Sequence, residues 1–242
     1  MKPNRWRLFM ALVAAPAILL SGPTASSEPV DDPDNGQFVP QYEEATSPDA
    51  IRGRDLAVKF QDLDILAHNA GLVYHLPYDI PIIGKECGDE NAYWDPAAKT
   101  ITMCYEYFLV ADKFAVENSA GDEARYIGLY SAVVDMAFFH ETGHMAIDLY
   151  DLPATGREED NADQVAALVL LTDPTGQGAE EIQNAAAFWY SVSTDPASLG
   201  AESFADEHSL EQVRAYNLDC WLYGSDPAPY IDLVEPVGPL PK

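Results

Sequence analysis

The sequence predicts an α+β domain that is mainly helical and carries one small, mostly antiparallel sheet or hairpin. Two observations support this class. Segments rich in β-branched and aromatic residues are confined to residues 72–107, and nearly everything after them has helical character. The longest apolar segment, "RYIGLYSAVVDMAFFHETGHMAIDLY" from Arg125 to Tyr150, contains no proline and predicts a buried helix.

The N-terminus has the three regions of a secretory signal peptide, which we expect to span residues 1–27. Its first residues are basic, an apolar run follows from Leu8 to Leu20, and small residues precede the expected cleavage site after Ser27. The run is too short to span a bilayer comfortably, which takes about 20 residues, although an uncleaved anchor is the alternative. We therefore expect a protein that is secreted or periplasmic and has no membrane segment after cleavage.

Two regions follow the signal peptide. Residues 28–50 are acidic, contain prolines and lack periodicity, so we expect a flexible acidic leader. Residues 51–242 are long enough for one sizeable core, and we expect them to form a single domain. At its start, the apolar residues between Ile51 and about Ala70 suggest a helix.

The chain is strongly acidic, with a formal net charge of −27 that becomes more negative once the basic signal peptide is removed. Such a surface repels nucleic acid and anionic lipid, so neither is an expected partner. It mildly favours basic substrates, although the charge of a whole surface is weak evidence about a cleft. The charge leaves the oligomeric state open.

Two of the three cysteines bracket a predicted hairpin. The segments "DIPIIGKECG" and "KTITMCYEY" have strand character, and "WDPAAK" between "NAY" and "TITM" is a turn signal. In an exported chain, a disulfide between Cys87 and Cys104 across neighbouring strands is therefore expected. Cys220 is left over. Its partner lies in a segment absent from this chain or on another molecule, or else it is a buried free thiol.

The segment "HETGH" lies on the predicted long helix. His140 and His144 are four residues apart, so both imidazoles project from one face about one turn apart and can chelate one Zn²⁺. Glu141 lies beside the first histidine, where its carboxylate can reach a metal-bound water without ligating the metal. The alternative is a helix whose histidines are hydrogen-bonded core residues, but a buried helix has little other reason to carry these groups.

A hydrolytic zinc site takes three protein ligands and one water, so a third ligand is needed. The three-histidine pattern would place a glycine at Ile147 and a histidine at Tyr150, and neither is present. A second helix begins at "REEDNADQVAALVLL", with Glu159 and Asp163 on one face. Glu159 can therefore be the third ligand, and Asp163 can accept the other ring N–H of a ligating histidine. Glu158 and Asp160, beside Glu159, are expected to be solvated or to neutralise the helix dipole.

These residues carry a resemblance to known proteins. "HETGH" followed by "GREEDNAD" resembles the gluzincin branch of zincin metallopeptidases. Together with "ECGDENAYWDP", "MCYEY" and "HSLEQVRAYNLDCWLYGSDP", these motifs are similar to a bacterial family of secreted proteins described as "putative metallopeptidases". The resemblance covers roughly residues 52–235 and implies a zincin-like domain with one zinc ion. It makes His140, His144 and Glu159 the zinc ligands and Glu141 the general base.

A further donor should stabilise the oxyanion. His208 is one candidate because "DEHSLEQVRAYN" opens a downstream helix, as such donors do in gluzincins, and Tyr105 is the other because it follows a predicted strand. In zincins an edge strand of the sheet pairs with an extended peptide. "TITMCYEY" suits that role, or it is an interior strand.

The predicted function is hydrolysis of peptide bonds in a peptide or protein substrate. Two alternatives remain open at this stage. One is a non-catalytic metal-binding or scaffold protein that keeps the fold, and the other is a zinc hydrolase that acts on another amide or ester. Glu141 favours an enzyme, because a protein without catalysis has no need of the base.

Overall fold

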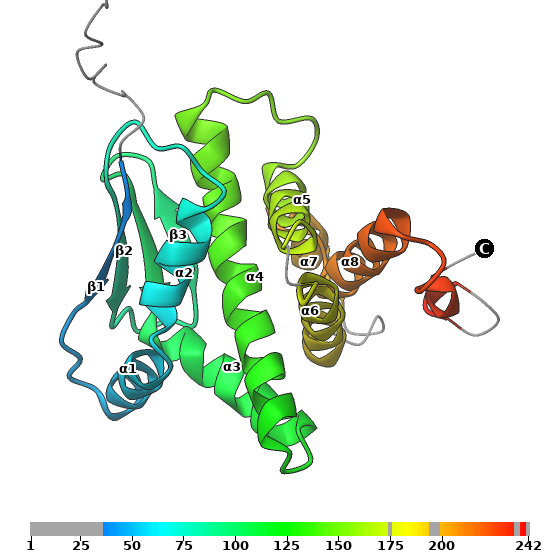
Figure 1. Ribbon diagram of the computed structural model, residues 1–242, viewed down its shortest axis with the longest axis horizontal. Coiled ribbons are helices and arrows are strands. Elements are labelled where there is room, and N and C mark those ends of the chain that lie inside the picture. The colour runs from blue at the N-terminus through cyan, green and yellow to red at the C-terminus, as the bar shows by residue number, and fades with distance from the viewer. Residues whose placement is uncertain (1–35, 174–175, 194–198, 235–237, 241–242) are drawn as a thin grey trace, which may run out of the picture. The chain divides into compact units, whose positions relative to one another are not determined.

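The computed structural model describes residues 36–173, 176–193, 199–234 and 238–240 (Figure 1). The expected signal peptide lies outside these residues. The described chain is mainly helical with a small mixed sheet, which confirms the α+β class. In chain order the elements are β1 (Phe38–Tyr42), α1 (Pro48–Phe60), α2 (Asp62–Gly71), β2 (Ile80–Lys85), β3 (Ala92–Asp95), β4 (Thr100–Cys104), α3 (Tyr105–Asn118), α4 (Glu123–Leu149), α5 (Glu158–Leu171), α6 (Gly178–Val192), α7 (Ala201–Ala205), α8 (Glu211–Ser225) and the 3₁₀ helix η2 (Ile231–Leu233).

The four-stranded sheet has the order β1-β2-β4-β3. The pairs β1–β2 and β2–β4 are parallel, whereas β3 and β4 form an antiparallel hairpin. The prediction of a mostly antiparallel sheet was therefore wrong, although its hairpin is present. The connections explain the difference. Helices α1 and α2 return the chain to the same end of the sheet before β2 begins, and the hairpin brings β4 back between β2 and β3.

Strand β1 lies within the segment that was expected to be a flexible leader. All five of its residues pair with β2, and Phe38 is buried against the rings of Tyr74 and Phe138, with centroid distances of 6.1 and 6.3 Å. The prediction of a flexible segment was therefore wrong for the described part of residues 28–50. A strand this short, carrying Pro40 and flanked by polar residues, has no recognisable period. Proline is tolerated here because β1 is an edge strand.

The helix predicted over residues 51–70 is divided into α1 and α2. Ser47 caps α1 by accepting a hydrogen bond from the Ala50 N–H at 3.2 Å. Gln61 then adopts a left-handed conformation with φ of 58°, which ends α1 and turns the chain directly into α2. The periodicity of apolar residues continues through this single residue, so the sequence pattern did not reveal the break.

Helix α4 is the long buried helix that the sequence predicted. It begins at the Asp122 cap, whose carboxylate accepts from the Arg125 N–H at 2.8 Å. It packs against the sheet and α3 on one side and against α5 and α6 on the other (Figure 1). Apolar residues therefore surround it without forming one stripe. Even so, none of the helices in the described ranges combines the length and apolar character needed to cross a membrane.

The backbones of helices α4 and α5 come into close contact where Gly143 faces Ala162. A Cβ atom added at Gly143 would lie 2.8 Å from the Ala162 Cα atom and 3.0 Å from its carbonyl oxygen. No side chain fits at this point, so a glycine allows the two backbones to touch. Gly143 lies between His140 and His144 in the chain, and Ala162 lies between Glu159 and Asp163. The contact therefore sets the distance between the two groups of polar residues.

We expect Gly143→Ala to lower the free energy of unfolding by about 1–3 kcal/mol, the usual cost of overpacking a well-packed core. Gly128→Ala is the matched control on the same helix, because its Cβ would meet no atom closer than 3.7 Å. It should be neutral or stabilising, since alanine is the better helix former. Denaturant unfolding of both variants measures the difference. Equal stability of the two would mean that α5 does not depend on this contact.

Candidate metal centre

Two histidines of α4 project toward α5. The Nε2 atoms of His140 and His144 are 3.1 Å apart, and the ring centroids are 4.8 Å apart. This is the one-turn arrangement that the four-residue spacing predicted. Both side chains are largely buried, with exposed fractions of 6% and 15%. Two imidazole nitrogens at this separation need a proton or a cation between them.

Glu159, in the first turn of α5, completes a triangle with the two histidines. Its Oε2 atom lies 3.0 Å from the Nε2 atom of His140 and 3.2 Å from that of His144. Zinc binds imidazole and carboxylate at about 2.0–2.2 Å with tetrahedral geometry, which places neighbouring ligand atoms about 3.3 Å apart. The three separations are close to this value. The donor atoms of the triangle therefore fit one metal ion of this size.

The charges in the triangle depend on one another. Burial lowers the pKa of His140, but hydrogen bonds with Asp163 and Glu159 outweigh burial and raise it to about 9. For Glu159 burial acts in the opposite direction and raises the pKa. Its hydrogen bonds with three histidines nevertheless hold that pKa far below its usual range. The site thus holds a carboxylate between imidazoles, of which His140 keeps a proton at neutral pH. A metal cation bound here would replace that proton.

Asp163 orients His140 from behind. Its Oδ1 atom lies 2.7 Å from the Nδ1 atom of His140, so the Nδ1–H can donate to it while Nε2 faces Glu159. Asp163 is buried, and it also accepts from Arg214, at 2.7 Å from Nε and 2.6 Å from Nη2. Burial raises the pKa of Asp163, but the hydrogen bonds with His140 and Arg214 lower it to about 2. Asp163 therefore stays ionised beside the histidine.

Arg214 was not identified from the sequence. It lies in the first turns of α8, and its guanidinium stacks on the ring of Trp189 at 3.7 Å from the centroid. A buried arginine needs a carboxylate partner, and Asp163 is that partner. The residue is far from the motif in the chain, so only the fold reveals the contact. The one signal in the sequence that could have indicated this ion pair was a lone arginine within an apolar helix face.

His144 has a carboxylate on its second nitrogen as well. The Oε1 atom of Glu158 lies 2.9 Å from the Nδ1 atom of His144. Glu158 was expected to be solvated or to neutralise the helix dipole, and its contact with His144 was not foreseen. It is half exposed, at 52%, and therefore holds the ring less firmly than buried Asp163 holds His140. Each histidine of the triangle thus has its Nδ1 atom beside a carboxylate and its Nε2 atom toward the centre.

Glu141 lies beside the triangle and outside it. Its carboxylate is buried, and its Oε2 atom accepts a hydrogen bond from the backbone N–H of Trp94 at 2.8 Å. Burial raises its pKa, and the nearby histidines oppose that effect. Strand β3 therefore holds this buried carboxylate in place through the Trp94 N–H group. The contact with Trp94 was also not found from the sequence.

His208 reaches the triangle from the loop before α8. Its Nε2 atom is 2.9 Å from the Oε2 atom of Glu159, and ligand atoms of His140, Glu159 and His208 all lie within 4.8 Å of one another. Asp206 accepts from the His208 backbone N–H at 2.9 Å, while Arg157 donates to the His208 carbonyl oxygen at 2.8 Å. His208 is the most exposed of the histidines here, at 42%. It can therefore either ligate a metal or face a bound substrate.

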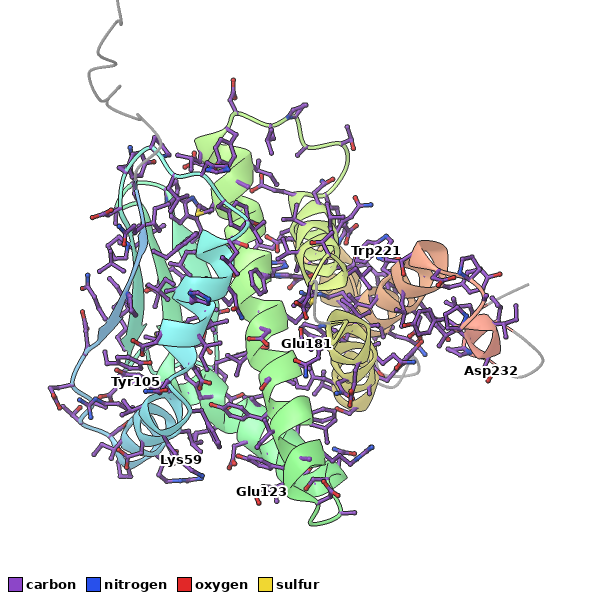
Figure 2. The ribbon with its side chains drawn as sticks, in the orientation of Figure 1. Lys59, Tyr105, Glu123, Glu181, Trp221 and Asp232 are labelled. Carbon is purple, nitrogen blue, oxygen red and sulfur yellow. A yellow bond between two sulfur atoms is a disulfide. The ribbon has the colours of Figure 1, made fainter. Side chains whose placement is uncertain are left out.

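Tyr105, the other candidate oxyanion donor, is the first residue of α3 and lies next to α1 (Figure 2). It is fully buried against Gly53 of α1 and Gly84 of β2, and its hydroxyl donates to the Glu43 carbonyl oxygen at 2.7 Å. Its role as an oxyanion donor is therefore excluded. Tyr107, two residues further along α3, lines the candidate site instead.

The residues of the centre open into a cleft of about 540 Å³. Strand β3 forms one wall, because it is the edge of the sheet, whereas β4, which we considered for that role, is an interior strand. Residues of α3, α4, α5, α6 and α8 and of the loop before α8 form the rest of its lining. The lining residues from these parts of the chain include Ala92, Trp94, Ala137, Glu141, Trp189, His208 and Arg214.

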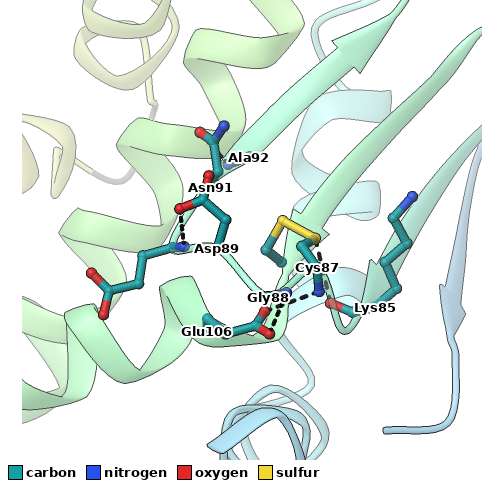
Figure 3. Close-up of a disulfide and its surroundings, with 9 residues drawn as sticks. Lys85, Cys87, Gly88, Asp89, Asn91, Ala92 and Glu106 are labelled. Carbon is teal, nitrogen blue, oxygen red and sulfur yellow. Dashed lines mark hydrogen bonds between the residues drawn. A yellow bond between two sulfur atoms is a disulfide. The ribbon is translucent and has the colours of Figure 1, made fainter.

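A disulfide supports the segment that leads into β3. Cys87 and Cys104 are joined as expected, with Cα atoms 5.4 Å apart (Figure 3). Glu106 accepts from the backbone N–H groups of Cys87 and Gly88 at 3.2 and 2.8 Å. The start of the loop is thus fixed by a covalent bond and two hydrogen bonds. The remaining thiol, Cys220, is exposed and unpaired, which excludes the buried alternative.

The fold and the site define an α+β protein with a cluster of metal-ligating side chains in a cleft. The chain belongs to the family described as "Putative metallopeptidase" (DUF4344), whose model matches residues 42–241. This confirms the family resemblance inferred from the motifs. No curated protein and no solved structure matches the chain.

We expect metal binding at this centre to strengthen with pH. Because the His140 pKa is raised to about 9, a metal must displace a proton at lower pH, so the apparent affinity for Zn²⁺ should rise about tenfold per pH unit until about pH 9. Competition with a chelator between pH 6 and 9 measures this slope. His68→Gln, which removes an exposed histidine elsewhere, should leave it unchanged.

The metal-free protein should respond in the opposite direction. A histidine with a raised pKa contributes stability that is complete below its unfolded value of 6.5 and is lost as the pH rises through about 9. Unfolding in the presence of a chelator, over the same pH range, measures this loss.

The chelator competition has its own contrary outcome. A Zn²⁺ affinity that does not vary with pH would contradict the role of His140 as a ligand.

Proposed function

We propose that the protein is an exported, zinc-dependent metallopeptidase. His140, His144 and Glu159 would hold the zinc ion, with Glu141 as the general base. The observation that carries the proposal is the triangle of three ligand atoms 3.0 to 3.2 Å apart beside a buried carboxylate that is not part of it. Membership of the metallopeptidase family supports the same activity. The disulfide fits an oxidising compartment, as the proposed export requires.

Each residue has a distinct task in this mechanism. Zinc, when bound, would supply a Lewis acid that lowers the pKa of water to about 7 and polarises a carbonyl group. Glu141 accepts the proton of the attacking water and then delivers it to the leaving amine, while the Trp94 N–H holds its carboxylate in place. His208 donates a hydrogen bond to the carbonyl oxygen as negative charge develops on it.

The edge of β3 would hold the peptide. Among the described strands, β3 pairs with β4 alone, so its other side can present backbone groups to the cleft. An extended peptide can add to such an edge by main-chain hydrogen bonds. The position of Glu141 beside Trp94 then brings the base next to the bound chain.

The alternatives are a metal-binding scaffold without catalysis and a zinc hydrolase for another amide or ester. The buried Glu141 argues against a scaffold, because burying a carboxylate outside the metal centre costs free energy that binding alone does not require. The edge strand in the cleft favours a peptide over a small amide or ester.

We expect Glu141→Gln to abolish cleavage of a mixed peptide library while the zinc content stays unchanged. Glutamine keeps the shape and can still accept from Trp94, but it cannot take a proton from water. The control is Glu117→Gln, the same exchange on the exposed face of α3, which should cleave like the wild type. Identical product profiles from Glu141→Gln and wild type would rule out the hydrolase.

His208→Ala distinguishes the two roles open to that residue. As an oxyanion donor, its loss should lower kcat by about 10²–10³, with zinc still bound. As a metal ligand, its loss should release zinc. Steady-state kinetics together with metal analysis of the purified variant decide between them. Full activity with full zinc content would exclude both roles.

A further inference from the structure

The loop between α7 and α8, residues 206–210, brings His208 to the candidate metal centre. Helix α7 before it has only five residues, and its aromatic side chain, Phe204, is exposed. A hollow of about 490 Å³ is lined both by residues 204–207 and by the start of α5. Apolar packing therefore contributes little at this point, and the position of His208 depends on hydrogen bonds.

Arg157 donates two of those hydrogen bonds. Its Nη1 atom lies 3.1 Å from the carbonyl oxygen of Asp206 and 2.8 Å from that of His208. An Nη1 group carries two hydrogen atoms, so each of them can donate to one carbonyl oxygen. Hydrogen bonds from a charged donor are roughly twice as strong as those between neutral groups. Arg157 therefore holds the backbone of the loop at the residue that carries the imidazole.

Asp206 orders the loop internally. Its Oδ1 atom accepts from the His208 backbone N–H at 2.9 Å and lies 3.3 Å from the Nδ1 atom of the ring. These contacts orient the ring relative to its own loop, but they do not attach the loop to another element. Among the hydrogen bonds and ion pairs of the described residues, Asp206 and His208 reach α5 through Arg157 and Glu159.

Arg157 and Glu159 belong to the same end of α5. Arg157 directly precedes the helix, and its carbonyl oxygen accepts from the side-chain amide of Asn161 at 2.6 Å. Glu159 lies two residues further along, and its Oε2 atom is 2.9 Å from the Nε2 atom of His208. The backbone of Arg157 is thus fixed to the helical turn that carries Glu159. A loop that leaves Arg157 also moves His208 away from Glu159.

We propose that Arg157 is a positioning residue that holds His208 at the metal centre. It contacts neither the metal nor the substrate in this role, and it acts through the carbonyl oxygens of Asp206 and His208. The inference rests on the proposed peptidase function, in which His208 faces the substrate or ligates the metal, and it applies to either role. Without Arg157, the loop keeps its internal turn, but His208 is no longer held beside Glu159.

The first test follows the loop without using catalysis. Chymotrypsin cleaves after large apolar side chains, and the exposed Phe204 lies just before the loop. We expect chymotrypsin to cut the Phe204–Ala205 bond of zinc-loaded Arg157→Met about tenfold faster than that of the wild type, because cleavage follows the population of the opened loop. Arg52→Met, which removes an exposed arginine of α1, should be cut at the wild-type rate. An unchanged rate for Arg157→Met would overturn the inference, whatever the protein catalyses.

The second test is a double-mutant cycle with His208→Ala. In the wild-type background, Arg157→Met should lower kcat by about tenfold to hundredfold and change KM by less than about twofold, since a small misplacement of a reacting group has such an effect. In the His208→Ala background, the same substitution should change kcat by less than about twofold, because no imidazole is left to misplace. Arg157→Lys keeps a charged donor and should restore part of the loss.

The same cycle is measured as Zn²⁺ affinity for the case in which His208 is a ligand. Arg157→Met should then weaken Zn²⁺ binding only when His208 is present. Equal losses with and without His208, in both kcat and affinity, would mean that Arg157 merely supports α5 and would overturn this inference alone. Absence of Glu141-dependent cleavage by the wild type would overturn the proposed function and, with it, the role of Arg157 in catalysis.

Discussion

The close approach of α4 and α5 at Gly143 is the constraint on which the candidate site depends. The two histidines lie on either side of this glycine, and the two carboxylates that contact His140 lie on either side of Ala162. One added methyl group would separate the backbones and lengthen both contacts that Glu159 makes with the histidines. Helix α4 thus sets the spacing of the two histidines, and packing between α4 and α5 sets their distance from Glu159 and Asp163.

This arrangement requires a charged carboxylate to be buried. Asp163 lies in the core, where an ionised carboxylate is unfavourable unless it is hydrogen-bonded on all sides. His140 and Arg214 together satisfy it, and Trp189 covers the guanidinium. Helix α8 is therefore coupled to the histidine through one carboxylate, although it contributes no atom to the triangle. A substitution of Arg214 would therefore affect His140 through Asp163.

The sheet contributes to the site through its edge. Strand β3 holds Glu141 by a backbone N–H group, and the loop before β3 is tied to β4 and α3 by the disulfide and by Glu106. The base and the ligands are thus held by different parts of the fold. Helices fix the ligands, whereas the base depends on a hydrogen bond to an edge strand.

The sequence by itself determined the α+β class, the long buried helix, the disulfide and the residues that come together around His140. These features arise from local spacing: four residues set one helical turn, and a shared face places Glu159 and Asp163 together. Tertiary structure alone decided that β1 belongs to the sheet, that β2 and β4 are parallel, that Tyr105 is a core residue, and that Arg214 and Trp94 contact the site. Each of these depends on contacts between segments far apart in the chain. A local sequence pattern does not indicate which distant backbone group or side chain will make such a contact.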